Sequence, residues 1–182
     1  MKNLAWTAKI PDAIWAPVLE ALLVLLAGVI SLAFGQIWLF SSLGPTAFEV
    51  AEHPKRPSSR PRAIIIGHFT AIAIAFGSVA VFGAWNAPLA NPQHGLPLAR
   101  LWASAAAALL TAAVNLLLGT NQPASLATAL LITLGSFQSG YGALGMIAGV
   151  MLIAGLGIPL RKLGILRRNA GAPIPTKPAL AA

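Results

Sequence analysis

The chain has 182 residues, of which 57% are hydrophobic and only 9% are charged, and its 12 lysines and arginines outnumber its 4 acidic residues for a formal net charge of +8. Soluble domains carry about 25% charged residues, so this composition excludes an ordinary soluble enzyme domain and a disordered chain. The absence of cysteine excludes disulfides, thiolate metal sites and cysteine nucleophiles.

Four long apolar runs dominate the sequence: Val18–Phe40, Ala63–Trp85, Leu101–Gly119 and Gly142–Leu160. Each run has about 19–23 residues, which spans roughly 30 Å as a helix, the thickness of a bilayer core. Tryptophan and tyrosine stand at the edges of these runs, where aromatic rings meet the lipid headgroups. We therefore predict four transmembrane helices.

Two shorter segments lie between the long runs, Ser42–His53 and Asn121–Leu134. Each has a proline near its start, where a helix loses little from the missing N–H group. Each offers about ten residues of helix-capable sequence, which is too short to cross a bilayer as a helix alone. We predict a half-helix or a re-entrant element for both segments.

Basic residues gather near the N-terminus (Lys2 and Lys9), between Lys55 and Arg62, and in the tail after Leu160, whereas the 86–99 loop has none. If the short segments only dip into the membrane and return, the Lys55–Arg62 cluster lies outside. If each short segment carries the chain across, all three basic regions lie on the cytoplasmic side, as the positive-inside rule requires. We predict six crossings, with both termini cytoplasmic, in an inner (plasma) membrane of bacterial type.

A shift of 78 residues aligns the two halves of the chain, bringing Pro45 onto Pro123, Gly67 onto Gly145 and Gly77 onto Gly155. Three crossings per half would invert the halves, a recurrent transporter design with the substrate site near the midplane. The alternative is two similar helical hairpins. The predicted fold is an all-α polytopic membrane protein with a 3+3 inverted repeat. Its expected parts are an N-terminal segment (1–17), a transmembrane domain (18–168, with halves 18–85 and 98–160) and a flexible tail (169–182).

Apart from Glu20 near the start of the first long run, the acidic residues inside the apolar region lie in the first short segment. In a helix, Glu49, Glu52 and His53 share one face at i, i+3 and i+4. They could relay protons or face a cation. The structural alternative is pairing with the basic residues of the following loop.

Two further polar residues lie inside predicted spans. His68 is within the second span, where it could couple protons, donate to an anion or bond a neighbouring helix. Asn115 is the one amide in the middle of a span, and it suggests interhelical hydrogen bonding first and a pore-facing donor second.

Polar residues also mark the start of each short helix: Ser42 and Thr46 in the first, and Asn121, Gln122 and Ser125 in the second. The N-terminus of a helix attracts anions through its free N–H groups and its dipole. These side chains could replace the hydration shell of a small anion, or they could simply cap the helices. Further polar residues follow in the second half: Thr128, Thr133, Ser136, Gln138 and Ser139.

No phosphate-binding loop, zinc-protease motif or nucleophile elbow occurs, and no nucleophile–base pair is evident. We therefore expect no enzyme activity, no catalytic residues, no metal and no cofactor. Because the basic residues flank the spans, we also expect no nucleic-acid binding.

Several of these residues form a recognisable pattern. Ser42-Leu43-Gly44, then Pro54, Pro57, Pro61-Arg62 and Gly67-His68 resemble the HPP family of integral membrane proteins. The segment from Gln122 to Leu130 is similar to the name-giving segment of that family, with Gln122 and Ala124 in place of its His and second Pro. The resemblance covers roughly residues 18–165. It implies a small polytopic membrane protein, and some relatives are linked to nitrite transport.

The preferred hypothesis is a transporter or channel for a small inorganic anion such as nitrite, in a lipid bilayer, with a homo-oligomer allowed. The expected donors are Ser42, Thr46, Asn121, Gln122 and Ser125, with positive potential from Arg62 and His68. One alternative is a proton- or cation-coupled carrier that uses Glu49, Glu52 and His53. Another is a membrane scaffold subunit without transport activity.

Overall fold

A computed structural model describes residues 7–137 and 140–170 of the chain. Within these residues the protein is helical and contains no strand, which confirms the predicted all-α fold. The six helices are α1 (Asp12–Ala33), α2 (Leu43–Glu52), α3 (Pro61–Val81), α4 (Leu98–Leu117), α5 (Ala124–Thr133) and α6 (Gly140–Asn169). Short 3-10 turns stand at η2 (Thr7–Lys9), η3 (Pro57–Ser59) and η4 (Ala84–Asn86).

Four of the helices, α1, α3, α4 and α6, are long and apolar enough to cross a membrane. Large apolar side chains on them face outward, for example Leu32 (81% exposed) and Leu117 (85% exposed). An apolar outer surface is stable in lipid and unfavourable in water. The chain is therefore an integral, multi-pass membrane protein, as predicted.

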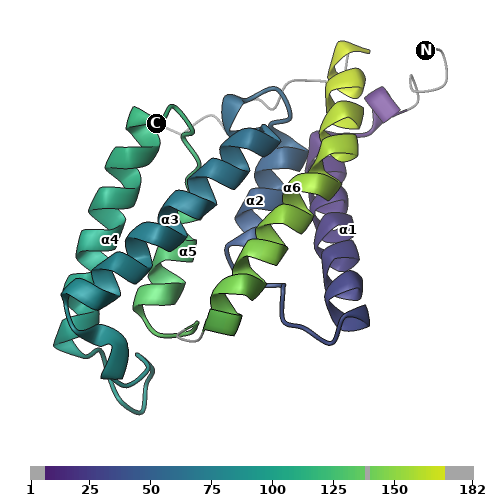
Figure 1. Cartoon of the computed structure of the whole chain (residues 1–182). Helices are drawn as coiled ribbons and strands as arrows, with labels where there is room; N and C mark the ends of the chain where they lie inside the picture. Colours follow the sequence, from purple (N-terminus) through teal and green to yellow (C-terminus); the bar gives the residue numbers. More distant parts are fainter. Residues whose placement is uncertain (1–6, 138–139, 171–182) are drawn as a thin grey trace, which may run out of the picture.

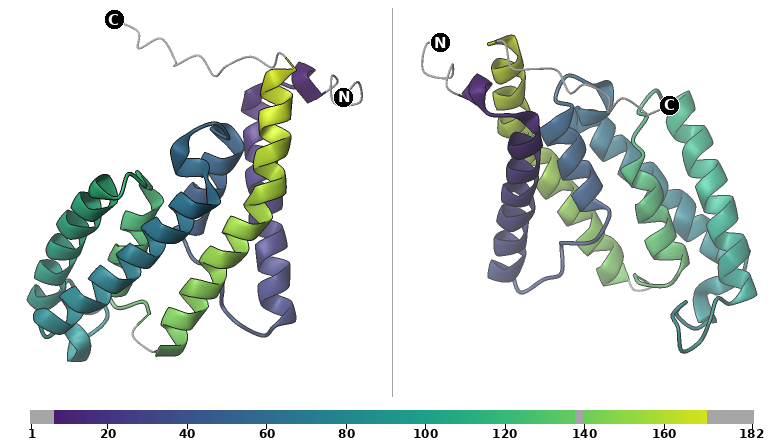
Figure 2. Two further views of the ribbon diagram at one scale, coloured as in Figure 1. Left: turned by 45° about the horizontal axis from the view of Figure 1, so that its top comes forward. Right: turned by 180° about the vertical axis from the view of Figure 1, so that it is seen from behind.

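The helices run alternately up and down, and both short segments take part in this alternation (Figures 1 and 2). The chain returns from the end of α1 through an extended stretch, residues 34–42, and then through α2. After α4 the chain returns through residues 118–123, which include turns and a positive φ of 41° at Asn121, and then through α5. Each short segment thus runs toward the other end of the bundle as non-helical chain followed by a short helix, and does not turn back (Figures 1 and 2).

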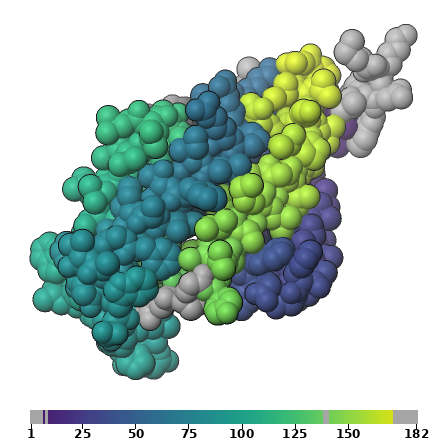
Figure 3. Space-filling view, viewed as in Figure 1, coloured from purple at the N-terminus to yellow at the C-terminus, as the bar shows by residue number. Residues whose placement is uncertain are grey.

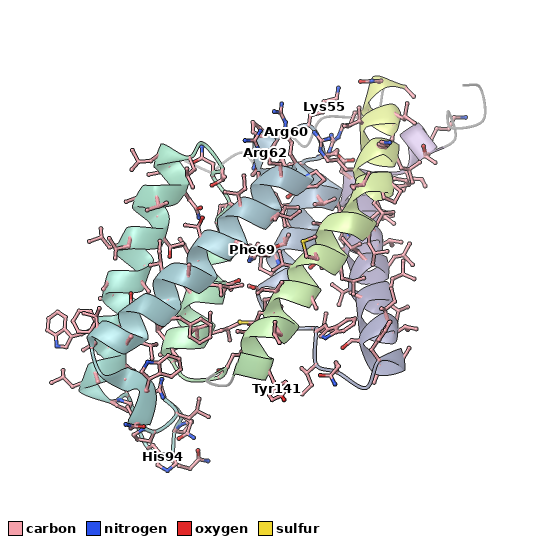
Figure 4. All side chains as sticks on the ribbon, viewed as in Figure 1. Lys55, Arg60, Arg62, Phe69, His94 and Tyr141 are labelled. Atoms are coloured by element: carbon pink, nitrogen blue, oxygen red, sulfur yellow. The ribbon has the colours of Figure 1, made fainter. Side chains whose placement is uncertain are left out.

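The basic residues mark one end of the bundle, which we call the basic end (Figure 4). Lys55, Arg60 and Arg62 lie there, whereas His94 and Tyr141 lie at the opposite end. The start of α1 and the end of α6 are also at the basic end. The cytoplasmic location of this end stays a prediction. Lys2, Gln138, Ser139 and residues 171–182 of the tail lie outside the described residues.

All four long helices differ from the predicted runs at their ends, most of all α1, which begins at Asp12 and not at Val18, and α6. Helix α1 ends at Ala33 and not at Phe40, because Gly35 takes a left-handed conformation (φ 61°). The Ser31 hydroxyl then accepts the Trp38 N–H at 2.9 Å, which holds the following chain extended. Helix α6 continues past Leu160 to Asn169, because its basic last turn is anchored at the basic end.

Two arginines anchor that last turn. Arg167, 1% exposed, forms an ion pair with Asp12, donates from Nε to the Thr7 carbonyl at 2.9 Å and lies 4.9 Å from the centre of the Trp15 ring. Arg168 lies 2.9 Å from the other Asp12 oxygen and donates to the Glu52 carbonyl at 2.9 Å. These contacts join the ends of α1, α2 and α6.

Arg100 anchors the end of the bundle opposite the basic end. Its side chain is fully buried and donates to the carbonyls of Pro88 (2.6 Å), Thr133 (2.9 Å) and Ala87 (2.5 Å). A cation is favoured at the C-terminal end of a helix, here α5. Arg100 therefore ties the loop after α3 to the end of α5.

The extended stretch before α2 lies directly on α6, where glycines leave room for it. A Cβ atom on Gly149 would overlap the Trp38 carbonyl oxygen, and one on Gly145 would stand 3.1 Å from the Ile37 carbonyl oxygen. In the same way, a Cβ on Gly67 of α3 would stand 2.8 Å from the Cβ of Gln122, just before α5. Glycines on α6 and α3 thus leave room for the non-helical part of each short segment.

Each short helix packs on the first long helix of its own half and on the last long helix of the other half. Helix α2 contacts α1 and α6, and α5 contacts α4 and α3. Helices α3 and α6 lie side by side across one face of the molecule (Figure 3). The packing of each short helix against helices of both halves is compatible with the inverted repeat, which itself stays a prediction.

Gly149→Ala should destabilise the protein by about 1–3 kcal/mol, because the new methyl group would force the backbone at Trp38 away from α6. Gly155→Ala is the matched control on the same helix, since nothing lies within 4 Å of its Cβ position. Unfolding of the detergent-solubilised variants measures the difference. Equal stability of the two variants would contradict the close contact between α6 and residues 37–40.

Candidate functional site

A closed ring of hydrogen bonds joins the start of α2 to α3 and α5. His68 bonds Thr46 through Nε2 at 3.0 Å and Thr128 through Nδ1 at 2.8 Å. The Thr128 hydroxyl also lies 2.6 Å from the Ser42 hydroxyl, and Thr46 donates to the Ser42 carbonyl at 3.0 Å. All four residues are fully buried. We call Ser42, Thr46, His68 and Thr128 the His68 network.

The directions of these bonds follow from the one proton that each hydroxyl carries. Thr46 donates its proton to the Ser42 carbonyl, so it accepts the bond from His68 Nε2–H. Nδ1 of the neutral imidazole then accepts from Thr128, whose oxygen accepts from Ser42. Every donor in the ring meets an acceptor with the imidazole uncharged, which is what a buried polar network requires.

Ser42 precedes α2 but does not cap it, since its side chain makes no bond to the N–H groups of the first turn. Its hydroxyl instead bonds Thr128 on α5 at 2.6 Å. The simple capping alternative therefore fails for Ser42. The polar residue at the start of one short helix is used to hold the other short helix.

A second polar group surrounds the start of α5. Asn115 of α4 donates to the Ser125 hydroxyl at 2.7 Å, and Ser125 donates to the Gln122 carbonyl at 2.6 Å. Thr120 donates to the backbone and side-chain oxygens of Asn115 at 3.1 and 3.0 Å. We call Asn115, Thr120 and Ser125 the Asn115 network.

Gln122 is the exception beside this network. Its side chain is only 2% exposed, yet neither its amide oxygen nor its amide nitrogen has a hydrogen-bond partner in the described part of the chain. Buried amides without partners are rare, and each unpaired group costs about 1–3 kcal/mol. Packing against Gly67 holds the side chain in place.

Gln122 lines a pocket of about 280 Å³ between α4 and the start of α5. The other lining residues are uncharged: Ala112, Asn115, Leu116, Asn121, Pro123 and Leu126. We call this the Gln122 pocket. An unpaired amide in a largely apolar pocket is typical of a site that binds a small polar molecule.

A second pocket, also of about 280 Å³, opens at the basic end. Arg60 and Arg62 line it together with Pro57, Ala63, Ile66, Leu118, Gly119 and Thr120. Both arginines are exposed, and their charges attract anions at the mouth of the protein. Thr120 lines this arginine pocket and also donates to Asn115, which lines the Gln122 pocket. One residue therefore connects the two pockets.

The acidic residues occupy a different place, at the end of α2. Glu49 accepts from Ser58 at 2.5 Å and lies 3.8 Å from Arg56, while Glu52 lies 3.2 Å from His53. These side chains are partly exposed and hold the following loop. The proton- or cation-coupled alternative stays a prediction, and its residues do not join either polar network.

The predicted site residues thus fall into three places. Ser42, Thr46 and His68 meet in the His68 network, and Asn121, Gln122 and Ser125 lie together at the start of α5. Arg62 lies in the arginine pocket, and no hydrogen bond joins it to His68 in the described residues. Within those residues no group of three histidine, aspartate or glutamate side chains could hold a metal ion.

Sequence reasoning gave Thr128 only a general lining role, although it is the hub of the His68 network. The available signal was its spacing from Ser125, because residues at i and i+3 share a helix face. Arg100 was also missed as a buried residue. It directly precedes the apolar run Leu101–Gly119, where a basic residue is usually a surface charge beside a transmembrane helix.

Thr128→Val should lower the free energy of unfolding by about 1–3 kcal/mol, because it leaves His68 Nδ1 and the Ser42 hydroxyl without their partner. Thr111→Val is the control, since the Thr111 hydroxyl is equally buried but has no partner in the described residues. Denaturant titration in micelles compares the two variants. A loss at Thr111 as large as that at Thr128 would contradict the network.

Comparison with known proteins agrees with this architecture. A family model that describes the HPP transmembrane region matches residues 6–168. No curated protein and no solved structure is similar enough to the chain to count as a match. The match extends over nearly all of the six-helix bundle, from the turn before α1 to the last turn of α6. The chain therefore belongs to the HPP family of transmembrane proteins.

Proposed function

We propose that this HPP-family protein moves a small inorganic anion, such as nitrite, across the membrane along the two short helices. The observation that carries the proposal is the Gln122 amide, which is buried in the bundle without a partner and lines a pocket. A protein buries such a group at a cost in stability, and binding a polar solute would remove that cost. Nitrite as the solute rests on the family resemblance.

The arginine pocket supports the first step of such a path. Arg60 and Arg62 raise the local concentration of anions at the basic end, because a pocket lined by one sign of charge focuses its electric field. Thr120 then connects this pocket, through its hydrogen bond to Asn115, to the Gln122 pocket. In this proposal the anion is collected at the arginines and is passed to Gln122 by way of Thr120.

In this proposal the His68 network is the central constriction of the transport path. Its hydroxyls are engaged with one another, so Ser42 and Thr46 would reach a solute only when the ring opens. Opening would free several donors at the start of α2, where the helix dipole favours negative charge. His68 is in this view a gate that links α2, α3 and α5, and not a permanent anion ligand.

The packing of the halves also supports a transporter design. Gly67 and Gly145, which the proposed repeat pairs, each face the extended segment of the opposite half. The proposed repeat also pairs Gly77 with Gly155, and a Cβ atom at either position would have no described atom within 4 Å. Inverted repeats with broken helices are common in transporters, with the site where the repeats meet. We propose transport, and not catalysis, as the role of this bundle.

Purified protein in liposomes should carry nitrite faster than protein-free liposomes, with nitrate, chloride and formate compared at two pH values. His68→Leu and Gln122→Leu should each reduce the flux about tenfold or more, because the first breaks the His68 network and the second removes the amide that would bind the solute. His94→Leu is the matched control, since His94 lies in the exposed 86–97 loop. Unchanged flux in both site variants would remove this assignment.

A further inference from the structure

The two unpaired polar atoms of the Gln122 amide determine which hydrogen-bonding groups a ligand must carry. A primary amide offers an N–H donor and a carbonyl acceptor side by side in one plane. Both ends are unpaired here, so the conclusion does not depend on which end is nitrogen and which is oxygen. A ligand that satisfies both must present an acceptor beside a donor.

A bare anion does not meet that requirement. It has only acceptor atoms, so it would accept from the amide N–H and be repelled by the lone pairs of the amide oxygen. Among the described residues no charged side chain lines the Gln122 pocket, and Arg60 and Arg62 line the arginine pocket. Burying an ion without a counter-charge costs far more than burying a neutral polar molecule.

An undissociated oxyacid meets the requirement fully. A group of the form O=X–OH donates its proton to the amide oxygen and accepts the amide N–H, closing a planar ring of two hydrogen bonds. Nitrous acid and formic acid both have this form. Chloride has no such form, and nitric acid is too strong to persist undissociated in water.

We infer that the Gln122 pocket binds its cargo as the neutral acid, an inference that rests on the proposed function. At the basic end the anion takes a proton from a hydronium ion, giving the neutral acid and water. The acid crosses past Gln122, and on the far side it returns the proton to water. One anion and one proton therefore move together, and no net charge crosses the membrane.

The fixed position of Gln122 strengthens this assignment. The Cβ and Cγ of Gln122 fill the space beside Gly67, where an added Cβ would stand 2.8 and 3.3 Å from them. The amide is thus held by packing, with both of its polar atoms buried and unpaired in the described residues. Preorganised groups bind with less loss of conformational entropy than mobile ones.

The test uses full-length protein in liposomes loaded with a pH-sensitive dye, with the membrane potential set by potassium and valinomycin. An inward nitrite or formate gradient should acidify the lumen at a rate that the imposed potential does not change. Protein-free liposomes supply the background of acid that crosses lipid unaided. Chloride and nitrate should give no protein-dependent flux.

Gln122→Met keeps the length of the side chain and removes both hydrogen bonds, so protein-dependent acidification should slow by about tenfold or more. Gln93→Met is the matched control at an exposed loop position and should leave the rate unchanged. An unchanged rate in Gln122→Met would overturn the assignment to Gln122.

The ion comparison on the unaltered protein separates the two proposals. Chloride or nitrate flux as fast as nitrite flux, with a rate that follows the membrane potential, would overturn the neutral-acid inference and leave anion transport standing. Absence of flux for all four ions would overturn both. Potential-independent acidification by nitrite and formate alone supports both.

Discussion

Inside a bilayer every backbone polar group needs a partner within the protein, and two stretches of this chain, residues 34–42 and 118–123, lie between its helices without being helical. Side chains and other backbone groups supply hydrogen-bond partners for these stretches, and glycines leave room for them. The Ser31 hydroxyl accepts the Trp38 N–H, the Asn115 carbonyl accepts the Thr120 N–H, and glycines on α3 and α6 let the extended chain lie close. The short helices, the pockets and the polar networks all depend on these two stretches.

The two stretches bring polar residues together that are far apart in the sequence. Ser42 and Thr128 are 86 positions apart, yet their hydroxyls lie 2.6 Å from each other beside His68. The His68 network is satisfied internally and stabilises one arrangement of α2, α3 and α5. Gln122, only a few residues before Thr128, is left unsatisfied. This contrast separates residues that hold the bundle together from Gln122, for which we propose a ligand-binding role.

Periodicity and composition were sufficient to predict the four long helices and the two short ones, because each leaves a local signal; the membrane crossing of the short segments stays a prediction. Helix ends were less predictable: the apolar run of α1 continues to Phe40, but Gly35 and Ser31 end the helix earlier. Thr128 and Arg100 could not be assigned, since their roles depend on contacts between distant segments. Pairing of the acidic residues with the following loop was one of the alternatives drawn from the sequence, and in the structure Glu49 contacts Ser58 and Arg56.

The meeting of the two short helices beside His68 is tested most directly by a cross-link, because the chain has no cysteine of its own. Ser42→Cys and Thr128→Cys, combined in one chain, should form an intramolecular disulfide on mild oxidation in the membrane, as their hydroxyls now lie 2.6 Å apart. Mass spectrometry of the digested protein would then find the two peptides joined, and each single-cysteine variant would remain unlinked within the chain. Two free thiols after oxidation of correctly folded protein would contradict this arrangement of α2, α3 and α5.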